Sequence, residues 1–331
     1  MKLLIIGLGS MGKRRIRNFQ FLQHEVIGFD PREDRRKEAN EKYGIQVFSE
    51  ITTALLEKPF AIVISTPPDL HMKFAKIAIE NKIPFFTEAS VVQDEMQDVI
   101  DSLKNSGIIG LPSCTTRYHP IVKEIEHLIQ SNSIGKPLSF LFHSGQYLPD
   151  WHPWEDYRKF YVSKKETGAC REIVPFELIW LVKIFGKIDS VVGRKSKVSN
   201  LETNIDDIYN VLLSFENKIE ASMTIDVLSK FPYRQMKIIG ENGVIFADWY
   251  EHTVKCFSKE NGWIEKKIDD GTIEQNYING EGPYIEEMKN FLSIIKKEVK
   301  QSYTFEDDIK ILKILESIEK SSDNGTREFI K

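Results

Sequence analysis

The chain has 331 residues, of which 41% are hydrophobic, so it is long enough for two domains with separate cores and too long for one ordinary domain. Its formal net charge of −4, from 45 basic and 49 acidic residues, gives no reason to expect nucleic acid or an anionic membrane as a partner. Three scattered cysteines without metal-ligand spacing, and no apolar run near the roughly 20 residues of a membrane span, predict a cytoplasmic protein with a small-molecule ligand and no metal site.

The first 30 residues are typical of a strand, a glycine turn, a helix and a second strand that ends in an acid. The turn has the spacing of a dinucleotide-binding fingerprint and contains Gly7, Gly9, Ser10, Met11 and Gly12. In this unit Gly7 allows a sharp turn, Gly9 lets the backbone approach a pyrophosphate, and Gly12 lets the helix pack closely on the sheet. The pyrophosphate would meet free N–H groups and the positive end of the helix dipole.

Asp30 ends the second strand, roughly 20 residues after the turn, where an acid would hydrogen-bond the adenosine ribose. This position favours NAD over NADP. Arg32 keeps the second nucleotide open, because it could meet a 2'-phosphate or stack on adenine. The commoner outcome is that Arg32 is solvated as the first residue of the charged run 32–37.

Over the first third of the chain, strands alternate with helices, which predicts a doubly wound α/β domain with a parallel sheet over residues 1–117. The further elements expected there are helix 33–43, strand 46–48, strand 61–65, helix 69–81, strand 83–87, helix 92–105 and strand 108–111. Pro67 and Pro68 stop strand 61–65. Because two prolines cannot extend a central strand, the chain must leave the sheet at its carboxyl edge, where such sheets bind ligands.

Residues 118–331 predict an α+β domain with a large sheet. Period-two alternation over 219–227 indicates a strand with one buried and one polar face, and Glu241-Asn242-Gly243 is a hairpin signal. The expected elements are helices 121–130, 168–184, 284–299 and 305–321, with strands beginning near residues 138, 188, 208, 219, 235, 244, 254 and 263. Tyr284 and Glu287 are interpreted as helix packing.

Several stretches, taken in their order and spacing, resemble the glucose-fructose oxidoreductase, inositol dehydrogenase and rhizopine-catabolism group, the Gfo/Idh/MocA family. They are Gly7–Gly12, Ser65–His71, Pro84–Glu88, Thr116–Pro120, Ser133–Pro137 and Gly168–Gly186. The resemblance implies a Rossmann domain followed by a larger α+β domain with an open, mostly antiparallel sheet. It also implies dimers or tetramers formed through that sheet, and hydride transfer between NAD(P) and a sugar, cyclitol or nucleotide-sugar carbon.

The resemblance also implies roles for single residues. It places the glycine turn at the pyrophosphate, Asp30 at the adenosine ribose, Thr66, Pro67 and His71 along the nucleotide cleft, and Glu88 beside the nicotinamide ribose. The match then breaks. Ala89 and Ser90 stand where the family has the lysine and proline of its Glu-Lys-Pro motif, and Glu172 and Phe176 stand where it has an aspartate and a catalytic histidine. These departures are typical of a divergent subgroup.

Hydride transfer from a carbinol needs a group that takes the hydroxyl proton. Glu172 is the first candidate, because it lies one helical turn before Phe176 on the same face, and a shielded carboxylate there would have a raised pKa. Alternatively it only offsets the helix dipole. Arg171 could clamp a substrate phosphate or carboxylate, or form an ion pair with Glu172 or another neighbour.

The segment 145–161 is too aromatic for an ordinary loop. It could line a carbohydrate pocket, or its rings could bury themselves against the sheet, as we expect for Trp151 and Trp154. His152, Tyr157 or Tyr161 could replace the missing lysine as proton donor, while His143 on a strand is interpreted as structural. Three functions stay open: a sugar oxidoreductase, a ligand sensor that keeps the nucleotide site without turnover, and an enzyme that uses tightly held NAD transiently.

Overall fold

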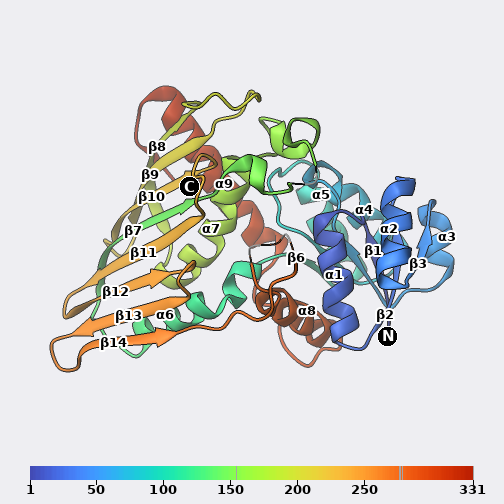
Figure 1. Cartoon of the computed structure of the whole chain (residues 1–331), viewed down its shortest axis with the longest axis horizontal. Helices are drawn as coiled ribbons and strands as arrows, with labels where there is room; N and C mark the ends of the chain where they lie inside the picture. The colour runs from blue at the N-terminus through green and yellow to red at the C-terminus, as the bar shows by residue number, and fades with distance from the viewer. Residues whose placement is uncertain (154, 276, 278, 331) are drawn as a thin grey trace. The chain divides into compact units, whose positions relative to one another are not determined.

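The structure is a computed structural model that describes residues 1–153, 155–275, 277 and 279–330 (Figure 1). The chain divides into two compact units, namely Met1–Thr115 with Glu281–Ile309, and Thr116–Gly280 with Lys310–Lys331. The predicted domains 1–117 and 118–331 differ from these units, because residues 281–309 belong to the first unit. The physical reason is that apolar residues of this segment, Met288, Phe291 and Leu292, lie in the core of the first unit.

The first unit contains a six-stranded parallel sheet in the doubly wound Rossmann order β3-β2-β1-β4-β5-β6, so the predicted doubly wound parallel sheet is confirmed. The strands are β1 (Lys2–Ile6), β2 (Glu25–Phe29), β3 (Gln46–Phe48), β4 (Ala61–Ile64), β5 (Phe85–Thr87) and β6 (Gly110–Pro112). The helices of this unit are α1 (Ser10–Phe21), α2 (Glu33–Tyr43), α3 (Ile51–Leu56), α4 (His71–Glu80), α5 (Met96–Ser106) and α8 (Gly282–Ile295).

Burial explains why β1 and β4 are the central strands. Residues Leu3 to Ile6 and Ala61 to Ile64 are completely buried, as expected for parallel strands covered by helices on both faces. Their carboxyl ends lead into the glycine turn and into the segment Ser65–Pro68. The candidate cofactor residues of this unit therefore follow the ends of neighbouring strands.

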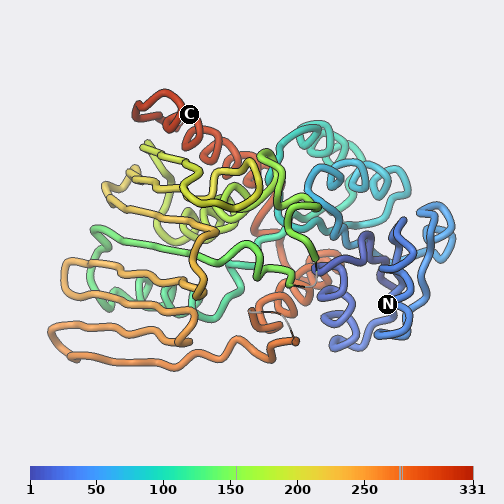
Figure 2. Tube along the Cα trace, turned by 45° about the horizontal axis from the view of Figure 1, so that its top comes forward, coloured from blue at the N-terminus to red at the C-terminus, as the bar shows by residue number. Residues whose placement is uncertain are grey.

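The second unit contains a nine-stranded sheet in the order β14-β13-β12-β11-β7-β10-β9-β8-β15. All neighbouring pairs are antiparallel except β7 with β10, so the predicted mostly antiparallel sheet is confirmed. Figure 2 shows β11 to β14, in orange, following one another across this sheet. The strands are β7 (Pro137–Gly145), β8 (Ile188–Ser196), β9 (Ile208–Phe215), β10 (Glu220–Asp226), β11 (Tyr233–Gly240), β12 (Gly243–Asp248), β13 (Thr253–Ser258), β14 (Gly262–Lys267) and β15 (Glu328–Phe329).

The two faces of this sheet differ in their cover. Helices α6 (Pro120–Gln130) and α7 (Cys170–Phe185) pack on one face, which we call the inner face. There Phe140 and Phe142 of β7 contact the rings of Phe185 and Trp180 in α7, with centroids 4.5 and 5.7 Å apart. Leu141 alternates with them and points to the opposite, outer face. A last helix, α9 (Phe305–Asn324), begins in the first unit and ends in the second.

The described part of the chain has neither a membrane-spanning helix nor a metal-binding cluster. None of its helices is both long enough and apolar enough to cross a membrane. Nor does any group of three or more His, Cys, Asp or Glu side chains among the described residues have an arrangement that could hold a metal ion.

Candidate functional site

The glycine turn leaves no space for side chains at two of its positions. A Cβ atom at Gly7, where φ is +90°, would lie 2.6 Å from the carbonyl oxygen of Ser65, and one at Gly12 would lie 1.8 Å from the carbonyl oxygen of Gly7. Helix α1 therefore packs directly against the turn. Gly9 precedes the helix and supplies no capping side chain, while Ser10 and Met11 open its first turn. The first N–H groups of a helix lack intrahelical acceptors, so this terminus fits a pyrophosphate.

Asp30 joins the end of β2 to this turn. Asp30 is 2% exposed, and its carboxylate accepts hydrogen bonds from the backbone N–H of Leu8 over 2.8 Å and of Arg32 over 2.9 Å. The Arg32 side chain instead pairs with Asp34 at the surface, with Nη2 and Oδ2 2.5 Å apart. Arg35, which the sequence analysis did not select, has Nη1 3.8 Å from Asp30 Oδ2 and lies next to Gly9.

At and beyond the ends of β4 and β5, four buried polar atoms have no hydrogen-bond partner among the described residues: Thr66 Oγ1, His71 Nδ1, Thr87 Oγ1 and Ser90 Oγ. Pro67 lies beside them in the chain. His71 Nε2 lies 3.0 Å from the carbonyl oxygen of Thr66, and burial lowers the pKa of this histidine, so Nε2 carries the proton and Nδ1 is an acceptor. Because buried polar atoms are normally paired, this edge of the sheet fits a ligand that carries both donors and acceptors.

Glu88 directly follows β5 and is buried. Arg15 of α1 donates to both of its oxygens, from Nε to Oε1 over 2.7 Å and from Nη2 to Oε2 over 2.8 Å. The Ser65 hydroxyl donates to Oε1 over 3.0 Å. The carboxylate is therefore held in one orientation at the end of its strand.

In the second unit, Glu172 lies in the first turn of α7. The Tyr161 hydroxyl donates to its Oε1 over 3.0 Å, while Oε2 is buried and has no hydrogen-bond partner among the residues described. Burial raises the pKa of Glu172 to about 7, against a smaller lowering by the Tyr161 hydrogen bond. A carboxyl group with this pKa populates both protonation states near neutral pH, as acid–base catalysis needs.

The approach of Tyr161 to Glu172 depends on Gly168. A Cβ atom at Gly168 would lie 2.1 Å from the carbonyl oxygen of Val162, so only glycine lets these two segments approach. The Thr167 hydroxyl also donates to the carbonyl oxygen of Tyr161 over 2.9 Å. The short loop between Tyr161 and α7 is thus folded tightly back on itself.

The other two catalytic candidates have different surroundings. Arg171 Nε donates to Glu319 Oε1 of α9 over 2.9 Å, so its ion pair is with Glu319 and not with Glu172. His152 stacks on Phe160 with ring centroids 5.3 Å apart. Trp151 is half-buried, whereas Trp154 lies outside the described residues.

Two family models match successive parts of the chain. The model described as "Oxidoreductase family, NAD-binding Rossmann fold" matches residues 1–114, and that of the "GFO/IDH/MocA C-terminal domain" matches residues 122–246. The chain belongs to the Gfo/Idh/MocA oxidoreductase family. The predicted enzyme class and the predicted cofactor NAD are thereby confirmed.

Several named proteins of similar sequence or structure align with almost the full length of this Gfo/Idh/MocA chain. It is 22% identical over 318 residues to myo-inositol 2-dehydrogenase of Thermotoga maritima, which covers 93% of this chain and 92% of that protein. A structure of an oxidoreductase from Agrobacterium radiobacter in complex with NAD+, L-tartaric acid and magnesium superposes with a TM-score of 0.88 at 16% identity, over 100% and 98% of the two chains. Levoglucosan dehydrogenase in complex with NADH gives 0.85 at 17%, over 100% and 99%. At these identities the two structures support the fold.

Among the charged contacts of the candidate site residues, Arg15, Arg35 and Glu319 were missed, which contact Glu88, Asp30 and Arg171. Glu287, interpreted as helix packing, contacts Arg15. Arg15 and Arg35 belong to helices with many charges, and no local pattern separates an inward-pointing arginine from a solvated one. For Arg15 the sequence held one weak signal. Arg15 lies three residues after Gly12, which is expected to pack closely on the sheet, and residues three apart share a helix face.

Proposed function

We propose that this protein is an NAD-dependent dehydrogenase or reductase that transfers a hydride to or from a carbinol carbon of a sugar, cyclitol or nucleotide sugar. The observation that carries the proposal is the carboxyl group of Glu172, with a pKa of about 7 and a buried, unpartnered Oε2. The myo-inositol and levoglucosan named for two of the similar proteins are polyhydroxylated rings, which supports this substrate class.

The proposed cofactor residues rest on the family resemblance, and the geometry of the first unit supports them. The glycine turn would hold the pyrophosphate, Asp30 the adenosine ribose with Arg32 nearby, and Glu88 the nicotinamide ribose. Thr66, Pro67 and His71 would line the nucleotide cleft. Bound NAD supplies the acceptor or donor of the hydride.

The proposed chemistry of the chain is a proton transfer at Glu172. In the oxidative direction, ionised Oε2 takes the proton of the substrate hydroxyl as the carbon loses its hydride. In the reductive direction, the protonated group returns that proton to the forming alkoxide. Tyr161 holds the other oxygen and fixes the orientation of the carboxyl group, while Arg171 and His152 are proposed as further contacts to polar groups of the substrate.

The test compares Glu172→Gln with the matched control Glu166→Gln, which changes an exposed carboxylate six residues earlier. Absorbance at the NADH band reports turnover with myo-inositol, levoglucosan and UDP-glucose as probes. Loss of a general base lowers kcat by about 10²–10⁴-fold, so Glu172→Gln is expected to lose activity at unchanged NAD affinity, whereas Glu166→Gln keeps both. Equal turnover of Glu172→Gln and the wild type would overturn the role of Glu172.

One observation favours a second function. Ala89 and Phe176 replace the residues that the resemblance assigns to proton handling, as would be expected in a sensor without turnover. If the wild type binds NAD and a sugar but forms no product, the sensor is supported. If product forms without any release of NADH, the transient use of tightly held NAD is supported instead.

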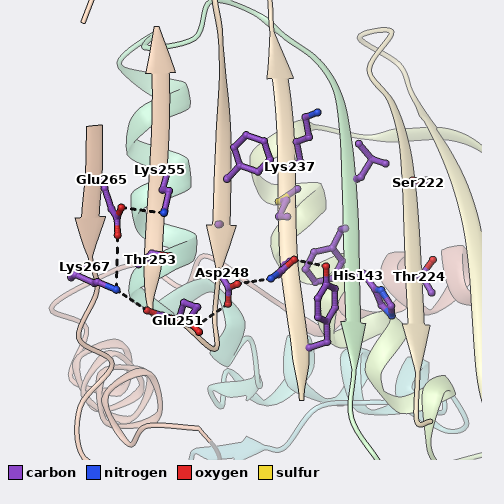
Figure 3. A pocket seen from close by; sticks show the side chains of 17 residues that line it. His143, Ser222, Thr224, Lys237, Asp248, Glu251, Thr253, Lys255, Glu265 and Lys267 are labelled. Atoms are coloured by element: carbon purple, nitrogen blue, oxygen red, sulfur yellow. Dashed lines mark hydrogen bonds and ion pairs between the residues drawn. The ribbon is translucent and has the colours of Figure 1, made fainter. Parts of the chain in front are cut away.

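We also infer that the protein forms a homo-oligomer through the outer face of the nine-stranded sheet. This face, shown in Figure 3, contains a cavity of about 530 Å³, and on the same face Leu141 and Leu212 are 51% and 57% exposed. It also carries both signs of charge, for example Lys255 and Glu265, whose Nζ and Oε2 are 3.1 Å apart. A two-fold symmetric interface needs such a self-complementary surface.

A further inference from the structure

One buried arginine in the first unit links two glutamates that are far apart in the sequence. Arg15 is fully buried, and its Nε and Nη2 bind both oxygens of Glu88, 73 residues later. The same Nη2 donates over 2.9 Å to Oε2 of Glu287 in α8, 272 residues later. A single guanidinium thus connects helix α1, the end of β5 and helix α8.

Glu287 extends this connection to the end of β6. Its Oε1 accepts from the Ser113 hydroxyl over 3.0 Å and from the Cys114 N–H over 2.7 Å, and its Oε2 accepts from the Thr115 hydroxyl over 2.5 Å. These three residues directly follow β6, the strand that pairs with β5. The segments that leave two neighbouring strands are therefore both tied to Arg15.

These strand ends also carry polar atoms that the protein leaves unpaired. Thr87 Oγ1 and Ser90 Oγ lie on either side of Glu88 in the chain, and together with Nη1 of Arg15 itself they are buried without a partner in the part of the chain that the structure describes. In a group with a purely structural role, such donors and acceptors would normally be satisfied within the fold. In a doubly wound sheet, ligands bind outside the carboxyl ends of the strands.

We propose that Arg15 is a positioning residue for the nicotinamide-ribose half of the NAD site. It acts through Glu88 and Glu287, holding the segments after β5 and β6 in the arrangement that binds this half of the cofactor. The inference rests on the proposed assignment of Glu88 to the nicotinamide ribose.

The experiment measures the dissociation constants of NAD+ and of ADP by titration calorimetry. ADP contains the adenosine and the pyrophosphate but lacks the nicotinamide riboside, so it reports on the glycine turn and Asp30 alone. In Arg15→Lys a positive charge is kept, but an ammonium group cannot bind one carboxylate with two parallel hydrogen bonds and a second carboxylate as well. We expect the Kd of NAD+ to rise about tenfold or more, equal to about 1.4 kcal/mol, with the Kd of ADP unchanged.

Arg17→Lys is the matched control. Arg17 lies in the same helix and its Nη2 also binds a glutamate, Glu281, over 2.7 Å, but this pair does not touch the ends of β5 or β6. Both ligands should bind to Arg17→Lys as they bind to the wild type. Should Arg15→Lys fail to fold, Glu287→Gln decides, because it keeps the shape of the side chain while removing the charge that Arg15 binds; it too is expected to weaken NAD+ and not ADP.

Two results would overturn the inference: equal weakening of NAD+ and ADP, which is the signature of general damage to the fold, or unchanged NAD+ binding in Arg15→Lys. A different result would contradict the proposed function instead. If the wild type bound ADP no more weakly than NAD+, the nicotinamide half would contribute no affinity, and the assignment of Glu88 would fail before any variant was compared.

Discussion

The hydroxyl of Tyr161 donates a hydrogen bond to Oε1 of Glu172 over 3.0 Å. Two effects on the carboxyl group oppose each other there: burial raises its pKa to about 7, and the hydrogen bond from Tyr161 lowers it. The hydrogen bond occupies Oε1 and leaves Oε2 without a partner. Tyr161 therefore influences both the orientation of Glu172 and its proton affinity.

Replacing this tyrosine should move the pH dependence of the reaction. In Tyr161→Phe the ionised form of Glu172 loses a hydrogen bond, so the pKa of Glu172 is expected to rise further. Because oxidation of a carbinol needs the ionised form, the limb of kcat/KM that rises with pH should shift to higher pH. The measurement is the pH profile of NADH formation from pH 5 to 10.

Tyr157→Phe serves as the control for that profile. Tyr157 is an alternative proton donor of the same aromatic segment, but its hydroxyl accepts a hydrogen bond from the Glu202 N–H over 3.4 Å, whereas the Tyr161 hydroxyl binds Glu172. Loss of the Tyr157 hydroxyl should leave the rising limb of kcat/KM at the same pH as in the wild type. A Tyr161→Phe profile that coincides with the wild-type profile would show that another group controls the ionisation.

Glu172 should also lower the free energy of unfolding above neutral pH. Its pKa is about 7 in the folded chain against 4.5 for the ordinary group, so the folded state binds the proton more tightly. Stability is therefore lost as pH rises from about 4.5 to about 7, by about 3 kcal/mol in all.

Glu172→Gln removes this ionisation, so at pH 8 the variant should be more stable than the wild type by up to about 3 kcal/mol, with the difference vanishing near pH 4. Urea unfolding at both pH values measures it, with Glu166→Gln as the exposed control. A difference that does not change with pH would contradict the burial of the charge.

The close contact in the glycine turn predicts a loss of both stability and affinity. In Gly12→Ala the new Cβ would start 1.8 Å from the Gly7 carbonyl oxygen, so α1 must move away from the turn, at a cost of about 1–3 kcal/mol. The Kd of NAD should rise as well, since the helix N-terminus moves with the backbone. Gly44→Ala is the control: its φ of +65° costs stability, but nothing lies within 4 Å, and NAD affinity should be unchanged.

Local signals in the sequence predicted most of the fold. Helix α2 has the ends that were predicted for a charge-rich helix over 33–43, and in the structure Glu33 and Asp34 begin it and Gly44 ends it in a left-handed conformation. Strand β15, with 2 residues, and helix α3, with 6 residues, were missed, since both are too short to show a periodic pattern. Short elements of this kind depend on neighbours that sequence periodicity does not show.

The members of the candidate site were harder to predict from the sequence the farther apart along the chain their contacts lie. Tyr161 and Glu172, 11 residues apart, were each selected on chemical grounds, although their hydrogen bond was not foreseen. Glu287 was interpreted as helix packing, because its partner Arg15 is 272 residues away and the pattern of α8 indicates only a buried face. Contacts at such separation are set by the tertiary fold.

The outer face of the nine-stranded sheet gives a last prediction, on the oligomeric state. Leu141 of β7 and Leu212 of β9 both lie opposite Ser222 of the intervening strand β10, in the same row of the sheet. Because both are more than half exposed in one chain, the double variant Leu141→Glu/Leu212→Glu should fold normally as a monomer. In a two-fold interface the same change would bring four like charges together at a desolvated contact.

Light scattering coupled to size-exclusion chromatography should therefore show a multiple of the 38.3 kDa chain for the wild type and a single chain for the double variant. Leu56→Glu is the control, since Leu56 is 78% exposed on α3 of the first unit and should leave the mass unchanged. A wild-type monomer, or a double variant that keeps the wild-type mass, would contradict association through this face. Unchanged circular dichroism of the double variant would show that the loss of mass reflects dissociation and not unfolding.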